Sequence, residues 1–578
     1  MNTNNSYRYG SLASARSIRL VILHSSTNAD APLVCDLIEV NLDSPPEYET
    51  LSYTWNDESP SESMTVMSTS YNCQTLLLTP NCASALRVLR KRIVGGTVAQ
   101  IGLWVDAICI NQSSNAEKST QVGMMAEIYS RASRVILWLG MSCAPPDLKS
   151  LWMIQLLRFL TTNGYEPEWL VPLMKWLHPI VGNLVAKGHR KEIISNISRA
   201  PYWSRMWTLQ ECTHTTSAFL CVTGQLCPLS TVRAIAYPNI FDHQVSNRLY
   251  LHFSLLQSLQ YVNTSQPPPW MMALSLQNML RMKASDPRDK IFALRELFHG
   301  VLQEIRVSYD RSPEELCSEA TRLLITKHQN LKVLLHGFVQ PNSPTLPSWA
   351  VNWVAEPTSV LSRRRLWESA ASEVNACNGA EPSINFSADG LRLVMKGTKI
   401  DNVGPCISQE LHPVDRANEE VRAKFGYSFP DFITKSLSTN AISRDGFTAG
   451  FKELFKIELV NDELKRPASE EAWRLLDKQT SPEEIWELTK YNENVATELI
   501  VSSAGGALFV TESGRLGKAN SEILEGDLIC VFAGLSVPLV VRPQGPYFEM
   551  VSPALVHGKM RGEVWPIDRG QLTEWEFV

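Results

Sequence analysis

The chain lacks any apolar run long enough to cross a membrane as a helix. Such a helix needs roughly 20 apolar residues, whereas the nearest stretch, Glu168 to Val185, is interrupted by Lys175, His178 and two prolines. The polar N-terminal segment also lacks the apolar core of a secretory signal. We therefore expect no membrane span, and a cytoplasmic protein with reduced thiols.

A strong charge of either sign is also missing. Lys and Arg number 54 against 59 Asp and Glu, a formal net charge of −5 over 578 residues, and the basic residues form no stripe. Nucleic-acid binding requires such a stripe, so we expect no nucleic-acid partner. The 12 cysteines show neither the spacing of a disulfide framework nor the C-x2-C pairs of a zinc site. We therefore expect no bound metal.

Strand and helix patterns alternate through about the first 230 residues. Short apolar runs at residues 51–53, 103–105 and 135–139 read as strands, and Ser114 with Glu117 forms a capping box at the start of a helix. Unbroken apolar strands between helices are typical of a parallel sheet covered on both faces. The pattern predicts an α/β fold with a parallel sheet.

Three regions follow from the change of pattern along the chain. We predict an α/β domain over residues 1–230, with an amphipathic helical insertion at about residues 145–200. Residues 231–340 read as mostly helical, including a helix from Pro313 to Lys327. Residues 341–578 read first as irregular and then as β-rich, with short strands bounded by Gly or Pro.

Polar side chains follow two of the predicted strands. Ligands of open parallel sheets bind beyond the carboxyl ends of the strands. Asp106 and Asn111 could instead only cap the turn that follows their strand. Two such strand ends together favour a binding site over two turns. The candidate site residues are Tyr53, Trp55 and Asp57 after the first strand, and Asp106, Asn111 and Gln112 after the second.

A third candidate element is the stretch PYWSRMWTLQE, which begins at Pro201. Trp203, Trp207 and Glu211 are spaced four apart, which predicts one shared helical face. The Glu211 carboxylate then either pairs with an arginine, as a structural group, or is partly desolvated with a raised pKa, as a reactive group. The spacing leaves both interpretations open. The later stretch Asp286 to Lys290 reads as a helix start held by ion pairs.

Together these stretches resemble the fungal heterokaryon-incompatibility (HET) domain. The resemblance rests on YETLSYTW from Tyr48, LWVDAICINQ from Leu103, RVILWLG from Arg134 and WSRMWTLQE from Trp203. It covers roughly the first 40% of the chain. The stretches DPRDKIFAL, LPSWAVNW and GDLICVFAG resemble the usual downstream half of such proteins.

The HET family is in turn similar to Toll/interleukin-receptor (TIR) domains. The resemblance therefore implies a flavodoxin-like sheet and an effector of nonself recognition and programmed cell death. It further implies cleavage of NAD as substrate, with Glu211 as the catalytic carboxylate. Trp207 would then be a stacking wall, and Asp57 or Asp106 would contact the ribose. Self-association and an unknown incompatibility partner protein are the expected interactions.

Two departures from the family pattern stand in this sequence. Asn56 occupies the position that is usually glycine, and no recognisable sensor domain or repeat array is present. An alternative function is therefore a small-molecule enzyme of a fungal secondary-metabolite pathway built on the same fold. A further alternative is a binding module without chemistry that signals by self-association.

Overall fold

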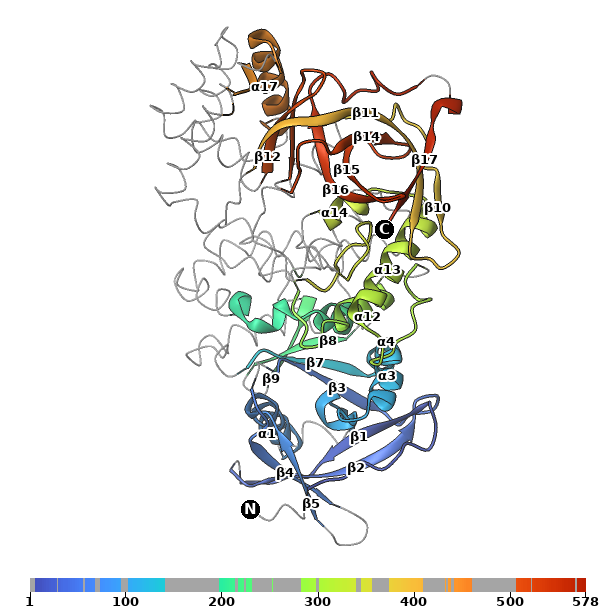
Figure 1. Cartoon of the computed structure of the whole chain (residues 1–578). Coiled ribbons are helices and arrows are strands. Elements are labelled where there is room, and N and C mark those ends of the chain that lie inside the picture. The colour runs from blue at the N-terminus through green and yellow to red at the C-terminus, as the bar shows by residue number, and fades with distance from the viewer. Residues whose placement is uncertain are drawn as a thin grey trace, which may run out of the picture. The chain divides into compact units, whose positions relative to one another are not determined.

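The computed structural model of the chain consists of two compact units (Figure 1). One unit comprises Met1–Pro267 with Arg281–Ser312, and the other Pro268–Leu280 with Pro313–Val578. The predicted insertion at about residues 145–200 lies almost wholly outside the described residues, and the boundaries at 230 and 340 remain predictions. The structure describes residues 6–140, 197–230, 252, 282–355, 374–408, 432–459 and 506–578, except 29, 56–57, 68–72, 95–101, 214–216, 223–224, 298–300, 339–344, 433–434, 438–440, 521 and 567–568.

The sheet of the first unit has nine strands in the order β5-β4-β2-β1-β6-β3-β7-β8-β9. Its four central strands, β6, β3, β7 and β8, run parallel to one another. Antiparallel pairs flank them on both sides. The strands are β1 (Ser17–Leu23), β2 (Leu33–Asn41), β3 (Tyr48–Tyr53), β4 (Glu62–Met67), β5 (Gln74–Leu78), β6 (Gly102–Trp104), β7 (Arg134–Trp138), β8 (Ala218–Val222) and β9 (Gln225–Pro228).

The sheet confirms one part of the sequence prediction and corrects another. Residues 51–53, 103–105 and 135–139 do belong to, or directly follow, neighbouring parallel strands of one sheet. A wholly parallel sheet was the wrong prediction, because β1–β2 and β8–β9 are antiparallel. Their connections are too short for the crossover that a parallel pair needs. The fold is therefore α/β with a mixed sheet.

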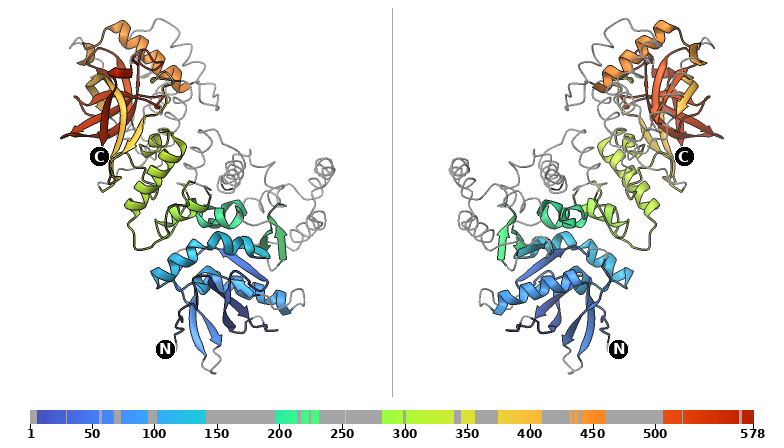
Figure 2. Two further views of the ribbon diagram at one scale, coloured as in Figure 1. Left: turned by 90° about the vertical axis from the view of Figure 1, so that its right-hand side faces the viewer. Right: turned by 90° about the vertical axis from the view of Figure 1, so that its left-hand side faces the viewer.

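Helices cover both faces of the central strands. The helices of this unit are α1 (Pro80–Val94), α2 (Asp106–Cys109), α3 (Asn115–Gly123), α4 (Met125–Arg131), η3 (Pro201–Ser204), α8 (Trp207–Thr213) and α12 (Asp289–Leu297). Successive side chains of a strand point to opposite faces. On β3, Glu49 pairs with Arg92 of α1, whereas the neighbouring Tyr48 bonds to a carbonyl of α4. Figure 2 shows α3 and α4, in cyan, running along the sheet.

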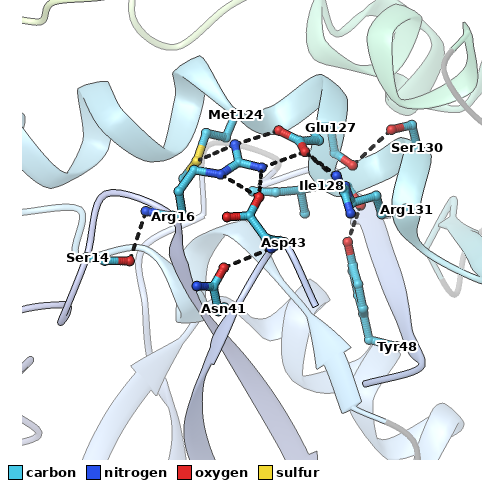
Figure 3. A network of polar contacts seen from close by, with 10 residues as sticks. All are labelled: Ser14, Arg16, Asn41, Asp43, Tyr48, Met124, Glu127, Ile128, Ser130 and Arg131. Atoms are coloured by element: carbon cyan, nitrogen blue, oxygen red, sulfur yellow. Dashed lines mark hydrogen bonds and ion pairs between the residues drawn. The ribbon is translucent and has the colours of Figure 1, made fainter. Parts of the chain in front are cut away.

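A polar network ties α4 to the chain segments beside β1 and β2 (Figure 3). The guanidinium of Arg16 donates to both carboxylate oxygens of Glu127, at 2.7 and 2.6 Å. It also donates to Asp43, at 2.6 Å. Beneath this network the Tyr48 hydroxyl donates to the Ile128 carbonyl at 2.6 Å. The start of β1 and the start of β3 are thus fixed to the same helix.

The β-strands of the second unit close into a barrel. Strand β11 pairs with β12 at one side and with β14 at the other, so the order β11-β12-β13-β16-β15-β14 returns to its start. The barrel interior is apolar, with Val403, Phe509, Ile529 and Val540 fully buried. Its strands are β10 (Ile384–Phe386), β11 (Leu393–Ser408), β12 (Gly506–Thr511), β13 (Leu516–Asn520), β14 (Leu528–Phe532), β15 (Leu539–Gln544), β16 (Tyr547–Val556) and β17 (Thr573–Phe577).

Strand β11 falls in the region that the sequence predicts as irregular. Its interior contains Gly397 and Gly404, which are unusual inside strands. A Cβ at Gly404 would lie 2.7 Å from the Val510 carbonyl oxygen, and one at Gly397 would lie 2.5 Å from the Phe532 ring. The glycines therefore permit close approach of neighbouring strands. The strands predicted after residue 507 are confirmed as β12 to β16.

The helix predicted from Pro313 to Lys327 is also confirmed. Helix α13 spans Pro313–His328, with Leu316, Ala320, Leu323 and Leu324 buried as their spacing predicts. Acidic residues occupy its first turn and basic residues its last, in agreement with the helix dipole. The other helices of this unit are α14 (Leu334–Gly337), α17 (Arg444–Leu459) and η6 (Arg569–Gln571). Among the described residues, no helix has the length and apolarity that crossing a membrane would require.

Candidate functional site

Strand β3 directs Ser52 towards helix α8. Ser52 lies on the same face of the strand as Tyr48, the face covered by α4 and α8. Its hydroxyl donates a hydrogen bond to the carboxylate of Glu211. The next side chain, Tyr53, lies on the opposite face beside Cys82 of α1. The strand therefore brings the Ser52 side chain to Glu211 and directs the Tyr53 ring away from it.

Glu211 is a buried carboxylate surrounded by hydroxyl donors. It is 2% exposed, accepts a hydrogen bond from Ser52 and lies beside the Tyr129 hydroxyl, which lowers its pKa. The Tyr202 hydroxyl lies 2.6 Å from the Ser52 hydroxyl. Since Ser52 gives its proton to Glu211, Tyr202 donates to Ser52 in turn. Burial raises the pKa of Glu211 to about 7, although Arg205 and the Ser52 hydrogen bond both lower it. The carboxyl therefore titrates near neutral pH.

Arg205 supplies the positive charge of this cluster. It follows η3 with extended backbone and donates a hydrogen bond to the Tyr53 carbonyl. Burial lowers its pKa, but the nearby carboxylates of Glu211 and Asp106 more than offset this, so that the pKa is raised. One guanidinium thus faces two carboxyl groups. Its single positive charge balances one carboxylate, so the cluster is electrically neutral only when the other carboxyl is protonated.

Asp106 stands at the carboxyl end of β6, as the first residue of α2. Its carboxylate accepts a hydrogen bond from the Ala107 amide at 2.7 Å. Burial raises the pKa of Asp106, and Arg205 opposes the rise. The Trp55 indole lies beside the same carboxylate. Asp106, Trp55 and the Tyr53 carbonyl therefore meet at the carboxyl edge of β3 and β6.

Asn111 and Gln112 shape the loop after Asp106. The Asn111 side chain accepts from the Ser113 amide at 3.2 Å, which is an Asx turn. The exposed Gln112 amide donates to the Asp106 carbonyl at 3.0 Å. Both side chains thus bond to the backbone of their own loop. The described contacts of these two residues are those of turn formation, the first interpretation offered by the sequence.

A buried ion pair anchors this loop to the sheet. Glu117 accepts from the Asn111 amide at 2.7 Å, and its own amide donates to the Ser114 hydroxyl, as the capping box predicts. Arg19 of β1 binds both oxygens of Glu117, at 2.5 and 3.1 Å, and donates to the Cys109 carbonyl. The side chains of Arg19 and Glu117 are only 6% and 12% exposed. The position of Asp106 therefore depends on a buried pair behind it.

The tryptophans of the third element do not share one helical face, so that prediction is wrong. Helix η3 ends at Ser204 and α8 begins at Trp207, with extended backbone at Arg205 between them. The Trp203 indole donates to the Ile197 carbonyl at 2.6 Å. Trp207 does lie one turn before Glu211 on α8, but its indole lies beside the carboxylate of Asp289 of α12. Each tryptophan therefore has its own polar partner.

The predicted site residues are thus only partly gathered. Glu211 and Asp106 lie near one another around Arg205, and Trp55 lies at Asp106. The Tyr53 ring, Asn111, Gln112 and the Trp207 indole have the separate contacts described above. Asp57 lies outside the described residues. Within the part of the chain that the structure describes, no three His, Cys, Asp or Glu side chains are grouped to hold a metal ion.

Three hydroxyl groups of the cluster do not stand out in the sequence. Ser52 could have been identified from the alternation of β3, because it shares a face with the core residue Tyr48. Tyr129 belongs to the apolar stripe of α4 and Tyr202 to the buried side of η3. Their hydroxyl groups look like ordinary tips of core side chains. Only the fold reveals that all three lie around one carboxylate.

Comparison with known proteins adds independent findings. Residues 48–211 match a family model described as heterokaryon incompatibility protein (HET), and residues 472–571 match one described as Het-6 beta-barrel domain. The curated protein "Heterokaryon incompatibility protein 6, OR allele" of Neurospora crassa is 24% identical over 465 residues, which cover 69% of this chain and 67% of that protein. No solved structure matches the chain. The first matched segment begins with β3 and ends at Glu211.

Proposed function

Because the chain belongs to the heterokaryon-incompatibility (HET) domain proteins, we propose that it acts in fungal nonself recognition. In this role it is a cytoplasmic effector that triggers programmed cell death after meeting an incompatible partner protein. The support is the pair of matched segments, in the two halves of the chain, and a curated relative that is named a heterokaryon incompatibility protein.

We further propose that the HET domain of this chain cleaves NAD at Glu211. The observation that carries the proposal is the buried Glu211 carboxylate, which has a pKa of about 7 and lies among hydroxyl groups. Strongly shifted carboxyls cluster at catalytic sites. The parallel strands add support, because their spatial order β6-β3-β7-β8 is 2-1-3-4 in chain order. That is how the flavodoxin-like strand order begins.

The chemistry requires the ionised form of Glu211. In NAD the bond between the ribose C1′ and the pyridinium nitrogen breaks, and its electron pair returns to the nitrogen. Nicotinamide leaves as a neutral molecule, so no general acid is needed. A carboxylate near the developing oxocarbenium ion stabilises its positive charge. Water then adds at C1′ and releases a proton, which yields ADP-ribose.

The burial of Glu211 sets a condition on this activity. At 2% exposure the carboxylate is out of reach of a dinucleotide in the described conformation. We therefore propose that self-association through the HET domain uncovers Glu211 and starts the reaction. A single chain would then be inactive, as a cell-death effector must be before its trigger. The assembled protein is the form to assay.

The experiment follows nicotinamide release from NAD by wild type and by Glu211→Gln, at concentrations where light scattering detects assembly. Gln keeps the shape of the side chain and removes its charge, so release should fall to background while the fold persists. Glu127→Gln is the matched control, because that carboxylate belongs to the surface network around Arg16. It should behave as wild type.

Two outcomes would remove Glu211 from this role. One is equal release from wild type and Glu211→Gln, and the other is no release from an assembled wild type. Either result would make Glu211 a structural carboxylate and favour the small-molecule enzyme of a secondary-metabolite pathway. The incompatibility role has a separate test, since induced expression in a fungal host should kill the cells. Growth at the control rate would contradict it.

A further inference from the structure

The stretch Asp286 to Lys290 lies beyond the segment matched to the HET domain, yet it belongs to the first unit. Its ion pairs are those that the sequence predicts. Arg288 binds Asp286 at 2.8 Å, and Lys118 of α3 lies 3.7 Å from the same carboxylate. The three side chains are partly buried, at 18–23% exposure, and their pairs hold the start of α12 to α3. The neighbouring Asp289 differs from Asp286 in being buried.

Asp289 is the first residue of α12 and is 8% exposed. Two donors from distant parts of the chain share its carboxylate. The Tyr309 hydroxyl donates to it at 2.5 Å, and the Trp207 indole of α8 lies beside it as a second donor. A buried carboxylate with two neutral donors is a strong acceptor, because charge-assisted hydrogen bonds are about twice as strong as neutral ones.

Tyr309 is itself fixed from several sides. The Lys118 ammonium lies 3.8 Å from the centre of its ring, and the Phe292 ring packs edge-on at 5.3 Å. Its backbone amide donates to the Ser119 hydroxyl at 3.2 Å, while its carbonyl accepts from Arg288. Helix α3 and helix α12 therefore hold Tyr309 between them. Because Tyr309 is fixed, the Asp289 carboxylate bonded to it also has little freedom to move.

A second contact from the same segment fixes the backbone just before α8. The amide of Lys283 donates to the Ser204 carbonyl at 2.6 Å. The Lys283 carbonyl accepts from the Met206 amide at 2.8 Å. These two bonds bracket Arg205, which carries the positive charge beside Glu211. Residues 282–309 thus contact both the backbone just before α8 and the side chain of Trp207, the first residue of α8.

We infer that Asp289 is a positioning residue for Glu211. By binding the Trp207 indole it fixes the first turn of α8, and Glu211 follows one turn later on that helix. Helix α8 has only seven residues, too few to be stable alone. Its orientation must come from tertiary contacts, of which the Asp289–Trp207 bond is one. The consequence for catalysis rests on the proposed NAD cleavage, whereas the consequence for α8 does not.

The test combines Asp289→Asn with a matched control, Asp310→Asn. Asn at position 289 keeps the volume but loses the charge and one acceptor site. Asp310 is an exposed aspartate of the same segment, and its carboxylate bonds to Asn115 of α3 rather than to α8. The first readout is hydrogen–deuterium exchange of peptides that cover α8 and, for comparison, β1. Both variants are made in the full chain.

In Asp289→Asn, exchange of the α8 amides should rise by roughly tenfold or more, the expected effect of losing a charge-assisted hydrogen bond. Exchange of β1 should stay as in wild type, and Asp310→Asn should change neither peptide. Unchanged α8 exchange in Asp289→Asn would overturn the inference. So would an equal rise in α8 and β1, because it would mean general destabilisation and no specific hold on α8.

Nicotinamide release gives the second readout. If the assembled wild type is active, Asp289→Asn should lower kcat by roughly tenfold to hundredfold, the known scale for displaced catalytic groups. The KM should remain within about twofold, because Asp289 makes no substrate contact in this scheme. Asp289→Glu should recover part of the kcat, and a wild-type kcat in Asp289→Asn would overturn the positioning role. An inactive wild type would reject NAD cleavage alone, since the exchange experiment still tests the hold on α8.

Discussion

The hydroxyl of Ser52 donates a hydrogen bond to the carboxylate of Glu211, although 159 positions separate the two residues. This bond joins the last part of β3 to α8, and the Tyr202 hydroxyl extends it by one more donor. The two ends of the segment matched to the HET domain are therefore joined inside one core. The state of the Glu211 proton is coupled to both hydroxyls.

The first prediction concerns the pH dependence of nicotinamide release. The ionised Glu211 is the active form, and its pKa is about 7. Because uncovering Glu211 removes part of the burial that raises this pKa, the rate of the assembled protein should rise with pH through a midpoint between the ordinary 4.5 and about 7, and then level off. Initial rates across this range would measure the midpoint. A rate that falls as pH rises would show that the protonated form is the active one, and would contradict the proposed chemistry.

The second prediction concerns stability. The pKa of Glu211 is raised by burial from an ordinary 4.5 to about 7, so the folded protein holds this proton more tightly than the unfolded chain. This contribution is fully present below pH 4.5 and is lost as pH rises towards 7, a change of about 3 kcal/mol. Glu211→Gln removes the dependence. Its Tm relative to wild type should therefore increase between pH 5 and pH 8.

Thermal unfolding of both proteins at several pH values would measure this difference. An unchanging Tm difference across the range would mean that Glu211 titrates alike in the folded and unfolded chains. Glu127→Gln is again the control. Arg16 lowers the pKa of Glu127 through hydrogen bonds, so its carboxylate stabilises the fold above its ordinary pKa. Its substitution should therefore act on stability with the opposite sign.

The third prediction separates Ser52 from its neighbours. The Ser52 hydrogen bond lowers the pKa of Glu211, so Ser52→Ala should move the midpoint of the activity profile above that of wild type. Activity lost at pH 7 should return at higher pH. Ser204→Ala is the matched control, because that exposed hydroxyl bonds only to the Pro201 carbonyl among the contacts described. A midpoint that stays in place in Ser52→Ala would show that the bond does not set the titration.

The fourth prediction compares two arginines that each bind a glutamate of the α3–α4 region. Arg19→Met leaves Glu117 buried without its partner and should cost about 3 kcal/mol or more. Arg16→Met breaks a network whose side chains are 31–57% exposed, and should cost less than about 1 kcal/mol. Thermal unfolding of the full chain would rank them. Equal losses of stability would contradict the assignment of the two pairs as buried and surface pairs.

The central strands could be predicted from the sequence because burial on both faces demands apolar runs, as in Val135 to Trp138. The direction of the flanking strands could not. Strand β1 is buried along almost its whole length, just as the parallel strands are, although its neighbours run antiparallel to it. Apolar patterning reports burial and not strand direction. Likewise, the reason for glycine at positions 397 and 404 is visible only once their close neighbours across the barrel are known.

The candidate site, too, could be predicted from the sequence only in part. Spacing identifies Glu211 as a carboxylate on a tryptophan-rich segment, but it predicts a continuous helix where the backbone is extended at Arg205. The partners of Glu211 come from β3, α4 and η3, and only tertiary structure brings them together. Asp289 belongs to the stretch predicted as a helix start held by ion pairs, and its burial could not be predicted for the same reason. It lies three residues from Asp286 in a charged stretch, and nothing local reveals that one is buried and the other is not.

The interleaving of the two units has a consequence for synthesis on the ribosome. The first unit is completed only by Arg281–Ser312, after the chain has already contributed Pro268–Leu280 to the second. A nascent chain that has emerged as far as residue 267 holds α8 but not Asp289 or Tyr309. At roughly 5–20 residues per second, the remaining 45 residues (312 − 267) take a few seconds to appear. During that interval Trp207 lacks its acceptor, and the newborn domain is exposed to chaperones and proteases before Glu211 is held in position.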